Sequence, residues 1–232
     1  MCGRFVSATP PDQVASYFGT EAPETVLEPS YNVAPTDDVY AVLSDGSTRR
    51  LDAFHWGLVP LWAKDAKIGS KMINARAGTL AEKNAYKSAF RSRRCLIPAD
   101  GFYEWQKHPT EAKGKKQPHF IHHPDGQPYA LAGLWELWRG PERDQEPLRS
   151  CTIITTSANQ PMAAVHDRMP VILPASAWDL WLDREQHDLD ILGQLLVPAP
   201  PQVISMHPVS TEVNNVRNDG AQLAQPIEPD GG

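Results

Sequence analysis

Short apolar and aromatic runs, separated throughout by proline and glycine, are the feature of this sequence that most limits its fold. The 232 residues include 22 prolines and 15 glycines, which interrupt helices and strands. Such short runs cannot span a bilayer, which needs about 20 apolar residues. We therefore expect an α+β fold with a curved, mostly antiparallel β-sheet core and peripheral helices. Nine strands are predicted at 39–43, 51–56, 95–98, 101–105, 119–122, 130–135, 151–156, 171–173 and 203–206.

Four segments carry helical signals, at 11–18, 79–91, 177–183 and 189–196. The first has proline in its first turn and ends at Gly19, which is the usual asymmetry of helix ends. Because no repeat or linker divides the chain, residues 1–221 are expected to form one domain. Residues 222–232, rich in proline, glycine and acidic residues, are expected to be a disordered tail.

Three cysteines are too few, and odd in number, to form a disulfide framework in a chain of this length. The opening residues Met1, Cys2, Gly3 and Arg4 do not begin a signal peptide. A reduced, soluble, cytoplasmic protein is therefore expected. Cys95 and Cys151 begin apolar runs and are predicted to be unreactive core thiols.

The net charge of −6 conceals a basic segment at 64–116. That segment holds 13 Lys and Arg against 5 Asp and Glu, whereas the remaining residues hold 9 against 23. Its excess of positive charge indicates an anionic partner such as nucleic acid. A solvated lysine-rich surface, neutralised by acidic residues elsewhere, is the alternative.

Cys2 is the residue with the most distinctive chemistry. Once Met1 is excised, Cys2 carries both a free α-amine and a thiol, whose ordinary pKa values are about 8 and 8.5. Such a 1,2-aminothiol forms an imine with an aldehyde, and the thiol then closes on the imine carbon to give a thiazolidine. Cysteine can also stand second by chance. The Met-Cys-Gly start further resembles that of N-terminal-nucleophile glutaminases, although these continue differently after Gly3.

Three polar residues lie in apolar or Gly/Pro-rich surroundings: Asn74, Glu104 and His166. A carboxylate between Tyr103 and Trp105 holds its proton more readily in a dry site, which suits proton transfer. A histidine can act as acid or base near pH 7. Each of the three residues can instead be a hydrogen-bonded polar group of the core.

No metal or cofactor site is predicted. His119, His122 and His123 are close in sequence, but neighbours on a strand point to opposite faces and cannot easily share an ion. Gly-rich phosphate loops are absent from the sequence.

Seven motifs, in order along nearly the whole chain, resemble the SOS response-associated peptidase family, the abasic-site processing proteins of bacteria and eukaryotes. They are Met1-Cys2-Gly3-Arg4-Phe5, Tyr31-Asn32-Val33-Ala34-Pro35, Trp56-Gly57-Leu58-Val59-Pro60-Leu61-Trp62, Ile73-Asn74-Ala75-Arg76, the run from Cys95 to Trp105, His166-Asp167-Arg168-Met169-Pro170, and His207-Pro208-Val209-Ser210 with Val213-Asn214-Asn215.

This resemblance implies that Cys2 crosslinks to the aldehyde of an abasic site in single-stranded DNA and shields the lesion. It implies that Asn74 positions the Cys2 amine, that Glu104 shuttles protons for imine formation, and that His166 assists opening of the sugar ring. It also implies autoproteolytic removal of Met1, weak abasic-site lyase activity and reversal of the crosslink.

The resemblance further implies that Arg4, Arg76 and Arg168 contact phosphates, and that Trp62 and Trp105 stack on flanking bases. Arginines that hold phosphates and aromatic rings that accept any base fit single-strand binding. Core packing is the alternative for both tryptophans. We expect a monomer that needs no cofactor and associates with the nucleoid when bound to DNA. A non-covalent single-strand-binding module, in which Cys2 is incidental, remains the alternative of a different class.

Overall fold

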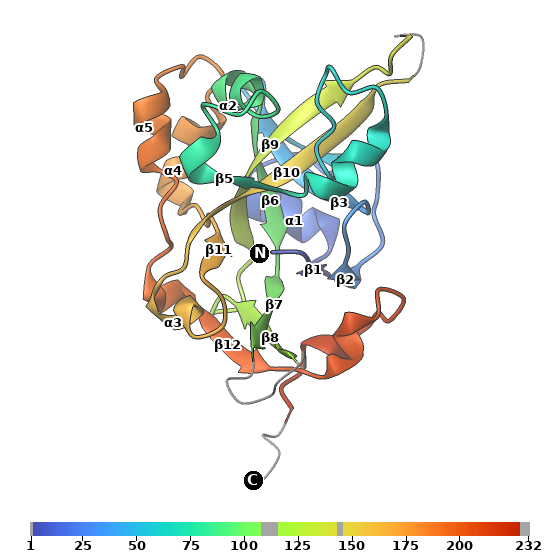
Figure 1. Cartoon of the computed structure of the whole chain (residues 1–232), viewed down its shortest axis with the longest axis vertical. Coiled ribbons are helices and arrows are strands. Elements are labelled where there is room, and N and C mark those ends of the chain that lie inside the picture. Colours follow the sequence, from blue (N-terminus) through green and yellow to red (C-terminus); the bar gives the residue numbers. More distant parts are fainter. Residues whose placement is uncertain (1, 108–115, 143–145, 228–232) are drawn as a thin grey trace.

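The computed structural model describes residues 2–107, 116–142 and 146–227, and two β-sheets form its centre (Figure 1). The strands are β1 (Phe5–Ser7), β2 (Ser30–Val33), β3 (Asp38–Ser44), β4 (Arg49–Trp56), β5 (Asn74–Arg76), β6 (Arg94–Ala99), β7 (Gly101–Lys107), β8 (Lys116–His122), β9 (Tyr129–Trp138), β10 (Leu148–Ser157), β11 (Arg168–Pro170) and β12 (Ser205–Pro208). The predicted fold class, α+β with mostly antiparallel strands, is confirmed.

The larger sheet closes on itself as a small barrel. Strands β4, β3, β6, β9 and β10 follow one another, and β10 pairs with both β9 and β4. The β10–β4 contact is parallel, as is the contact of β10 with β5. Closure leaves these five strands without a free edge.

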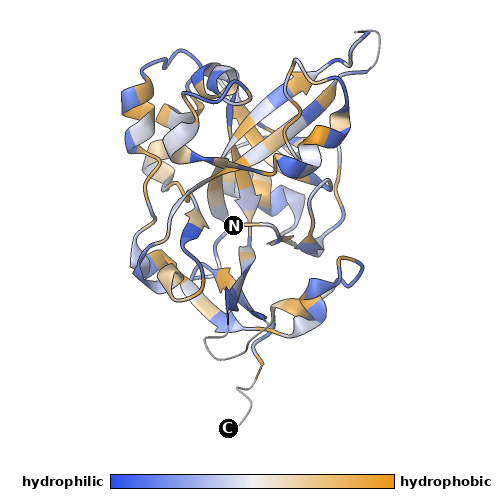
Figure 2. Ribbon diagram, viewed as in Figure 1, coloured by the Kyte–Doolittle hydropathy of each residue, from blue (hydrophilic) through white to orange (hydrophobic). Residues whose placement is uncertain are grey.

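Side-chain alternation along the barrel strands separates two cores. In β3, Val39, Ala41 and Leu43 belong to an interior cluster that also contains Cys2, whereas Tyr40 and Val42 belong to a cluster covered by helices. A period of two gives this division because successive strand residues face opposite sides. Figure 2 shows hydrophobic residues mostly along the central strands and hydrophilic ones mostly in the connecting loops.

The smaller sheet has the order β12-β8-β7-β1-β2 and is entirely antiparallel. It joins the barrel where β6 continues into β7, near the middle of Figure 1. Gly101 stands at this junction, where a Cβ atom would lie 2.5 Å from the carbonyl oxygen of Ile121. The backbones can approach this closely only at glycine.

Five α-helices are described: α1 (Pro11–Phe18), α2 (Lys87–Ser92), α3 (Gln160–Ala163), α4 (Ala175–Leu182) and α5 (Leu189–Gln194). Short 3₁₀ helices are η1 (Ala66–Lys71), η2 (Ala77–Thr79), η3 (Pro201–Val203), η4 (Thr211–Asn214) and η5 (Ala221–Ala224). Within the described part of the chain, no helix combines the length and the apolar character needed to cross a bilayer.

The predicted helix at 79–91 is wrong in its first half. Residues 80–86 form turns, in which Lys83 N–H donates to the Thr79 carbonyl, and α2 begins only at Lys87. Alanine, lysine and glutamate favour a helix here, but this preference is weak against tertiary packing. Leu80 from these turns and Phe90 from α2 are buried in the same core cluster.

The predicted tail at 222–232 begins too early. Leu223 is fully buried within η5, and the neighbouring Ala224 carbonyl accepts a hydrogen bond from His207 Nε2 at 2.8 Å. One buried apolar side chain is enough to hold this segment against the small sheet. Residues 228–232 lie outside the described residues.

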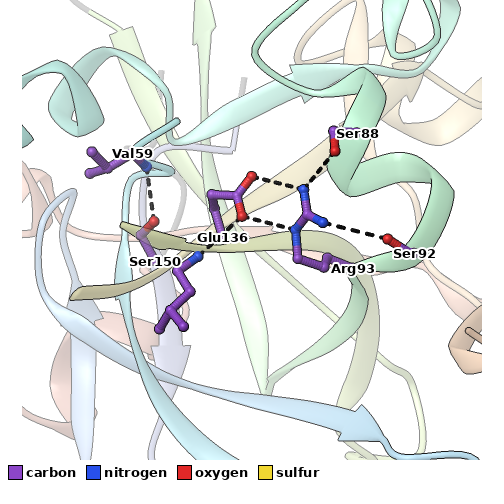
Figure 3. Close-up of polar contacts among 7 residues, drawn as sticks. Val59, Ser88, Ser92, Arg93, Glu136 and Ser150 are labelled. Atoms are coloured by element: carbon purple, nitrogen blue, oxygen red, sulfur yellow. Dashed lines mark hydrogen bonds and ion pairs between the residues drawn. The ribbon is translucent and has the colours of Figure 1, made fainter. Parts of the chain in front are cut away.

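A partly buried ion pair holds the end of α2 to the barrel. Arg93 Nε lies 2.9 Å from Glu136 Oε1, and Arg93 Nη2 donates to Glu136 Oε2 at 2.9 Å. Figure 3 shows Ser88 and Ser92 beside the guanidinium. The Glu136 carboxylate also accepts a hydrogen bond from the backbone N–H of Leu137.

Candidate functional site

Cys2 lies immediately before β1, and its side chain is fully buried. It belongs to the interior cluster with Phe5 and Trp56, whose rings meet edge to face at 5.0 Å. Burial, and secondly the negative charge of Glu104, raise the pKa of the Cys2 thiol well above its ordinary value. The thiol is therefore protonated at neutral pH, and a base must take its proton before the sulfur can attack.

Asn74 contacts the Cys2 backbone directly. It begins β5, which pairs with β10 through Ile153, and its Nδ2 donates to the Cys2 carbonyl at 2.7 Å. Its Oδ1 is buried and has no hydrogen-bond partner among the described residues. A buried acceptor without a hydrogen bond costs free energy of folding. This oxygen is therefore available to accept a hydrogen bond from a bound ligand or a reacting group.

Glu104 lies on β7, and the β1–β7 pairing brings it close to Cys2. Phe5 pairs with Phe102, and Tyr103 N–H donates to the Arg4 carbonyl at 3.0 Å, so the chain before Arg4 runs beside Glu104. Only 4% of Glu104 is exposed, and its Oε1 accepts a hydrogen bond from Trp105 N–H at 3.1 Å. A carboxylate is thus placed within electrostatic reach of a buried thiol.

His166 stands in the loop between α3 and β11. Its Nδ1 lies 3.0 Å from the backbone nitrogen of Arg168 and 2.8 Å from Asp167 Oδ1. The first contact uses Nδ1 as an acceptor, and the second uses Nδ1–H as a donor. The ring therefore has a neighbour for Nδ1 whether this nitrogen accepts or donates a hydrogen bond.

A hydrogen bond links the His166 loop to the strand of Glu104. Gln106, two residues beyond Glu104 on β7, donates from Nε2 to the Ala164 carbonyl at 3.0 Å. Met162, on α3 just before this loop, lies in the interior cluster with Cys2. The structure thus brings Cys2, Asn74 and Glu104 together and ties the His166 loop to them.

The three predicted phosphate-binding arginines separate into two groups. Arg76 on β5 and Arg168 on β11 lie near each other: burial first, and then the charge of Arg76, lower the pKa of Arg168. Arg168 Nη2 donates to the Thr155 carbonyl at 2.9 Å and to the Thr155 hydroxyl. Its Nε has no hydrogen-bond partner within the described chain. Two neighbouring guanidinium groups repel each other unless an anion comes between them.

Arg4 instead binds the C-terminal part of the chain. Its Nη1 donates to Asn32 Oδ1 at 2.7 Å and to the Val213 carbonyl at 2.8 Å, and its Nη2 donates to the Asn214 carbonyl at 3.3 Å. Some N–H groups of the Arg4 guanidinium therefore already donate hydrogen bonds within the protein. Its remaining N–H groups are available for the predicted phosphate contact.

Asn32 is a residue whose role the sequence does not reveal. It is buried, accepts from Arg4, and donates from Nδ2 to the carbonyls of Asn215 and Asn218 at 3.1 and 2.8 Å. It therefore links the segment that carries Cys2 to the segment after η4. A buried Asn amid apolar Val33 and Ala34 was a signal that could have singled it out.

The two predicted stacking tryptophans differ in exposure. Trp62 is 59% exposed, in the loop between β4 and η1. Trp105 is half-buried, packs with the small-sheet cluster, and donates from Nε1 to Asn214 Oδ1 at 2.7 Å. Trp62 is therefore free to meet a ligand with a whole face, whereas Trp105 is anchored.

The other two cysteines are structural. Cys95 and Cys151 are fully buried free thiols, as predicted, and burial raises the pKa of both. The His122 and His207 rings lie 5.4 Å apart, and burial lowers the pKa of His119. Among the described residues, no group of three or more His, Cys, Asp or Glu side chains is placed to hold a metal ion.

The chain is similar in sequence and in fold to known proteins. The family model described as "SOS response associated peptidase (SRAP)" matches residues 1–216. The abasic site processing protein YoqW of Bacillus subtilis is 43% identical, over 97% of this chain and 99% of its own. The abasic site processing protein HMCES of Gallus gallus is 36% identical, over 86% of this chain and 67% of its own. A crystal structure of a protein from Bacteroides thetaiotaomicron superposes with a TM-score of 0.85 at 21% identity, covering 98% of this chain and all of that one.

Proposed function

The chain belongs to the SOS response-associated peptidase family, and from this premise we propose that it processes abasic sites in DNA by bonding covalently to them through Cys2. The observation that carries the proposal is the hydrogen bond from Asn74 to the Cys2 backbone beside the carboxylate of Glu104. Once Met1 is removed, an α-amine and a thiol would both stand on Cys2, near the Glu104 carboxylate. The proposed substrate is the ring-opened aldehyde of an abasic site in single-stranded DNA.

The first step is imine formation. The α-amine of Cys2, freed by hydrolysis of the Met1–Cys2 bond, attacks the aldehyde carbon, and one water molecule leaves. Asn74 Oδ1, the buried acceptor without a partner in the described chain, is suited to orient an amine N–H. His166 transfers the proton that opens the sugar ring and so exposes the aldehyde.

The second step is ring closure. The Cys2 S–H adds across the C=N bond, so that a C–S bond forms and the nitrogen regains a proton. Because the pKa of the thiol is raised, Glu104 is needed to accept the thiol proton and return it to nitrogen. The same raised pKa argues against a preformed thiolate, which a glutaminase would use to attack an amide.

DNA is held around this centre by charge. Arg76 and Arg168, whose mutual repulsion a phosphate would relieve, are two of the proposed contacts with the DNA backbone, and Arg4 is a third, separate one. Removal of Met1 by the Cys2 centre, weak β-elimination from the imine, and reversal of the crosslink belong to the same proposal. So does action as a monomer in the cytoplasm without a cofactor.

Intact mass spectrometry tests the proposal. The purified protein is incubated with single-stranded DNA containing one abasic site, and with the same strand carrying a reduced site that has no aldehyde. The expected product has the mass of the chain from Cys2 onward plus the oligonucleotide minus one water, with the aldehyde strand alone. Binding of both strands without any such product would instead identify a non-covalent single-strand-binding module.

A further inference from the structure

Strand β8 places a histidine on the face of the small sheet that packs toward Cys2. Ile121 on this strand belongs to the interior cluster that contains Cys2, whereas the neighbouring Phe120 belongs to the cluster on the opposite face. Because successive residues of a strand point to opposite faces, His119 shares the face of Ile121. His119 is half-buried, so its ring is in contact with both the protein and solvent.

Glu104 is the direct cross-strand neighbour of this histidine. Strands β7 and β8 lie side by side in the lower half of Figure 1, and their antiparallel pairing sets Glu104 opposite His119. The next opposed pair, Tyr103 and Phe120, meets on the other face with ring centroids 5.3 Å apart. Directly opposed residues of an antiparallel pair have Cβ atoms about 4.5–5.5 Å apart. The Glu104 carboxylate and the His119 imidazole are therefore close enough to exchange a proton directly or through one water molecule.

A backbone carbonyl fixes which nitrogen of the His119 ring carries the hydrogen. Nδ1 lies 3.2 Å from the Gln117 carbonyl oxygen, which can only accept, so Nδ1 is the donor. In the neutral ring, Nε2 is then unprotonated and can take up a proton. Burial lowers the pKa of His119, against the hydrogen bond to Gln117, which raises it, and with the charge of His207, which lowers it further. The ring is therefore mostly neutral at pH 7.

The other charged or titratable groups around His119 come from β8 itself, from the elements that pack against it, and from the His166 loop. They are Glu104 and Lys107 on β7, Lys116 on β8, His207 on β12, Glu212 on η4, and His166 with Asp167 in the loop that Gln106 ties to β7. His207 pairs with Phe120 and so lies on the opposite face of the sheet. Glu212 and Asp167 are exposed, whereas Glu104 is buried. Glu104 is therefore the buried carboxylate of this set.

The proposed reaction releases a proton that needs a path to solvent. The α-amine, with an ordinary pKa of about 8, is mostly an ammonium group at pH 7. When it combines with the thiol and an aldehyde, the C=O bond breaks and C–N and C–S bonds form. Of the hydrogens on the ammonium and the thiol, one stays on nitrogen, two leave in the water molecule, and the last leaves as a proton. Glu104 is only 4% exposed, so a proton that it accepts has little direct access to solvent.

We propose that His119 acts through Glu104 as the outlet for this proton. Nε2 of the neutral ring takes the proton from the Glu104 carboxyl group and passes it to water, which restores Glu104 as a base. His119 does not meet the substrate, so it is a positioning residue that keeps Glu104 in its reactive form. The inference rests on the proposed function and adds a second side chain to the proton path.

The test measures how the reaction depends on the buffer. A single-stranded oligonucleotide with one abasic site is mixed with excess protein at pH 7, in dilute and in concentrated imidazole buffer at constant ionic strength. The rate of heat-stable adduct formation is compared for the wild type, His119→Gln and His119→Phe. His122→Gln is the matched control, because it alters another half-buried histidine of β8 whose ring stacks on Phe120 on the opposite face.

We expect both His119 variants to form the adduct about 10-fold more slowly in dilute buffer, a smaller loss than the about 100-fold that removal of a general acid–base group typically causes. Concentrated imidazole should restore their rates, because a small base takes up the proton in place of the side chain. The wild type and His122→Gln should react equally fast in both buffers. In a Glu104→Gln background, His119→Gln should cause no further loss, because its effect passes through Glu104.

A wild-type rate in the His119 variants would overturn the inference. So would a slow rate that imidazole does not restore, which a purely structural role would give, or an equal loss in His122→Gln. A further loss from His119→Gln in the Glu104→Gln background would separate His119 from Glu104 and overturn it as well. Failure of the wild type to form any adduct with the aldehyde strand would instead refute the proposed function.

Discussion

Two polar clusters in this protein differ in how far their groups are paired within the described chain. In the Arg93–Glu136 cluster, the guanidinium pairs with the carboxylate and with two serines, and the carboxylate also accepts a backbone N–H (Figure 3). In the Cys2 cluster, Asn74 Oδ1 has no hydrogen-bond partner among the described residues, and burial first, then the charge of Glu104, raise the pKa of the Cys2 thiol.

The difference indicates what each cluster is for. Buried polar groups that are fully paired fix one arrangement of the chain, whereas each unpaired group costs free energy of folding. A site that keeps such groups gains stability in another state, which under the proposed function is the complex with an aldehyde and DNA. Substitutions in the two clusters should therefore separate chemistry from stability.

Removal of the thiol is expected to have the largest effect. Cys2→Ala and Cys2→Ser keep the α-amine once Met1 is excised, so each can form an imine but neither can close a stable thiazolidine. We expect no heat-stable adduct on denaturing gels, and an adduct only after borohydride reduction. Strand cleavage should persist or rise because ring closure no longer removes the imine. A normal yield of heat-stable adduct from Cys2→Ala would transfer the chemistry to another residue.

Loss of the proposed proton carrier should have the next largest effect. Glu104→Gln is expected to slow adduct formation by about 100-fold or more, which is the usual contribution of general acid–base catalysis. Borohydride-trapped and untrapped product should fall together, because imine formation itself is slowed. Glu136→Gln is the matched control, with the same change in another buried carboxylate, and should leave the rate of the folded protein unchanged. Equal rates for Glu104→Gln and wild type would remove Glu104 from the mechanism.

The paired cluster should respond in the opposite way. Arg93→Ala leaves Glu136 buried without its cation, which typically costs about 3–5 kcal/mol of stability. Urea unfolding should show this loss, whereas adduct formation by the folded fraction should continue at the wild-type rate. The double variant Arg93→Met with Glu136→Leu should recover much of the loss because no charge remains buried. Unchanged urea stability in Arg93→Ala would mean that the pair contributes nothing.

The sequence singled out residues that the structure brings together, but it did not predict several of the strands that hold them. Cys2, Asn74 and Glu104, which come from three distant parts of the chain, do meet in the structure. Yet β1, β2 and β5 were not predicted, because they have only three or four residues and too little periodicity to be recognised. Closure of the barrel could not be predicted from the sequence either, because it depends on pairing of β10 with β4 rather than on any local pattern.

The arginines show a second limit of sequence reasoning. Nothing in the motifs distinguishes Arg4, which binds Asn32 and the Val213 carbonyl, from Arg168, which lies near Arg76. The side chains that occupy a guanidinium are set by tertiary packing. Only the structure can therefore show which hydrogen bonds a charged side chain already makes within the protein.

Alkaline pH tests the buried thiol through stability. Burial raises the pKa of the Cys2 thiol in the folded protein above its ordinary value, so unfolding releases a proton above about pH 9. Stability from this source is fully present below pH 9 and is lost as pH rises, by about 1.4 kcal/mol per pH unit. The slope of unfolding free energy against pH between 9 and 10.5 should be shallower in Cys2→Ala than in wild type, and unaltered in Arg93→Ala. Parallel slopes for Cys2→Ala and wild type would show that the thiol is not held protonated.

The smallest expected effect distinguishes Arg76 and Arg168, which are proposed to bind phosphate, from Arg93, which already pairs with the Glu136 carboxylate. Arg76→Gln or Arg168→Gln should lower the log–log salt slope for undamaged single-stranded DNA by about 0.7 each, equally for all sequences. Between 50 and 200 mM salt, this corresponds to a change in relative affinity of only about 2.6-fold. Arg4→Gln should lower the slope similarly and also lower stability, because it breaks the contacts with Asn32 and Val213. Arg93→Gln should lower stability alone, since its guanidinium is neutralised by Glu136. Base-specific losses at Arg76 or Arg168 would contradict phosphate contacts, and a slope change at Arg93 would erase the distinction between the two clusters.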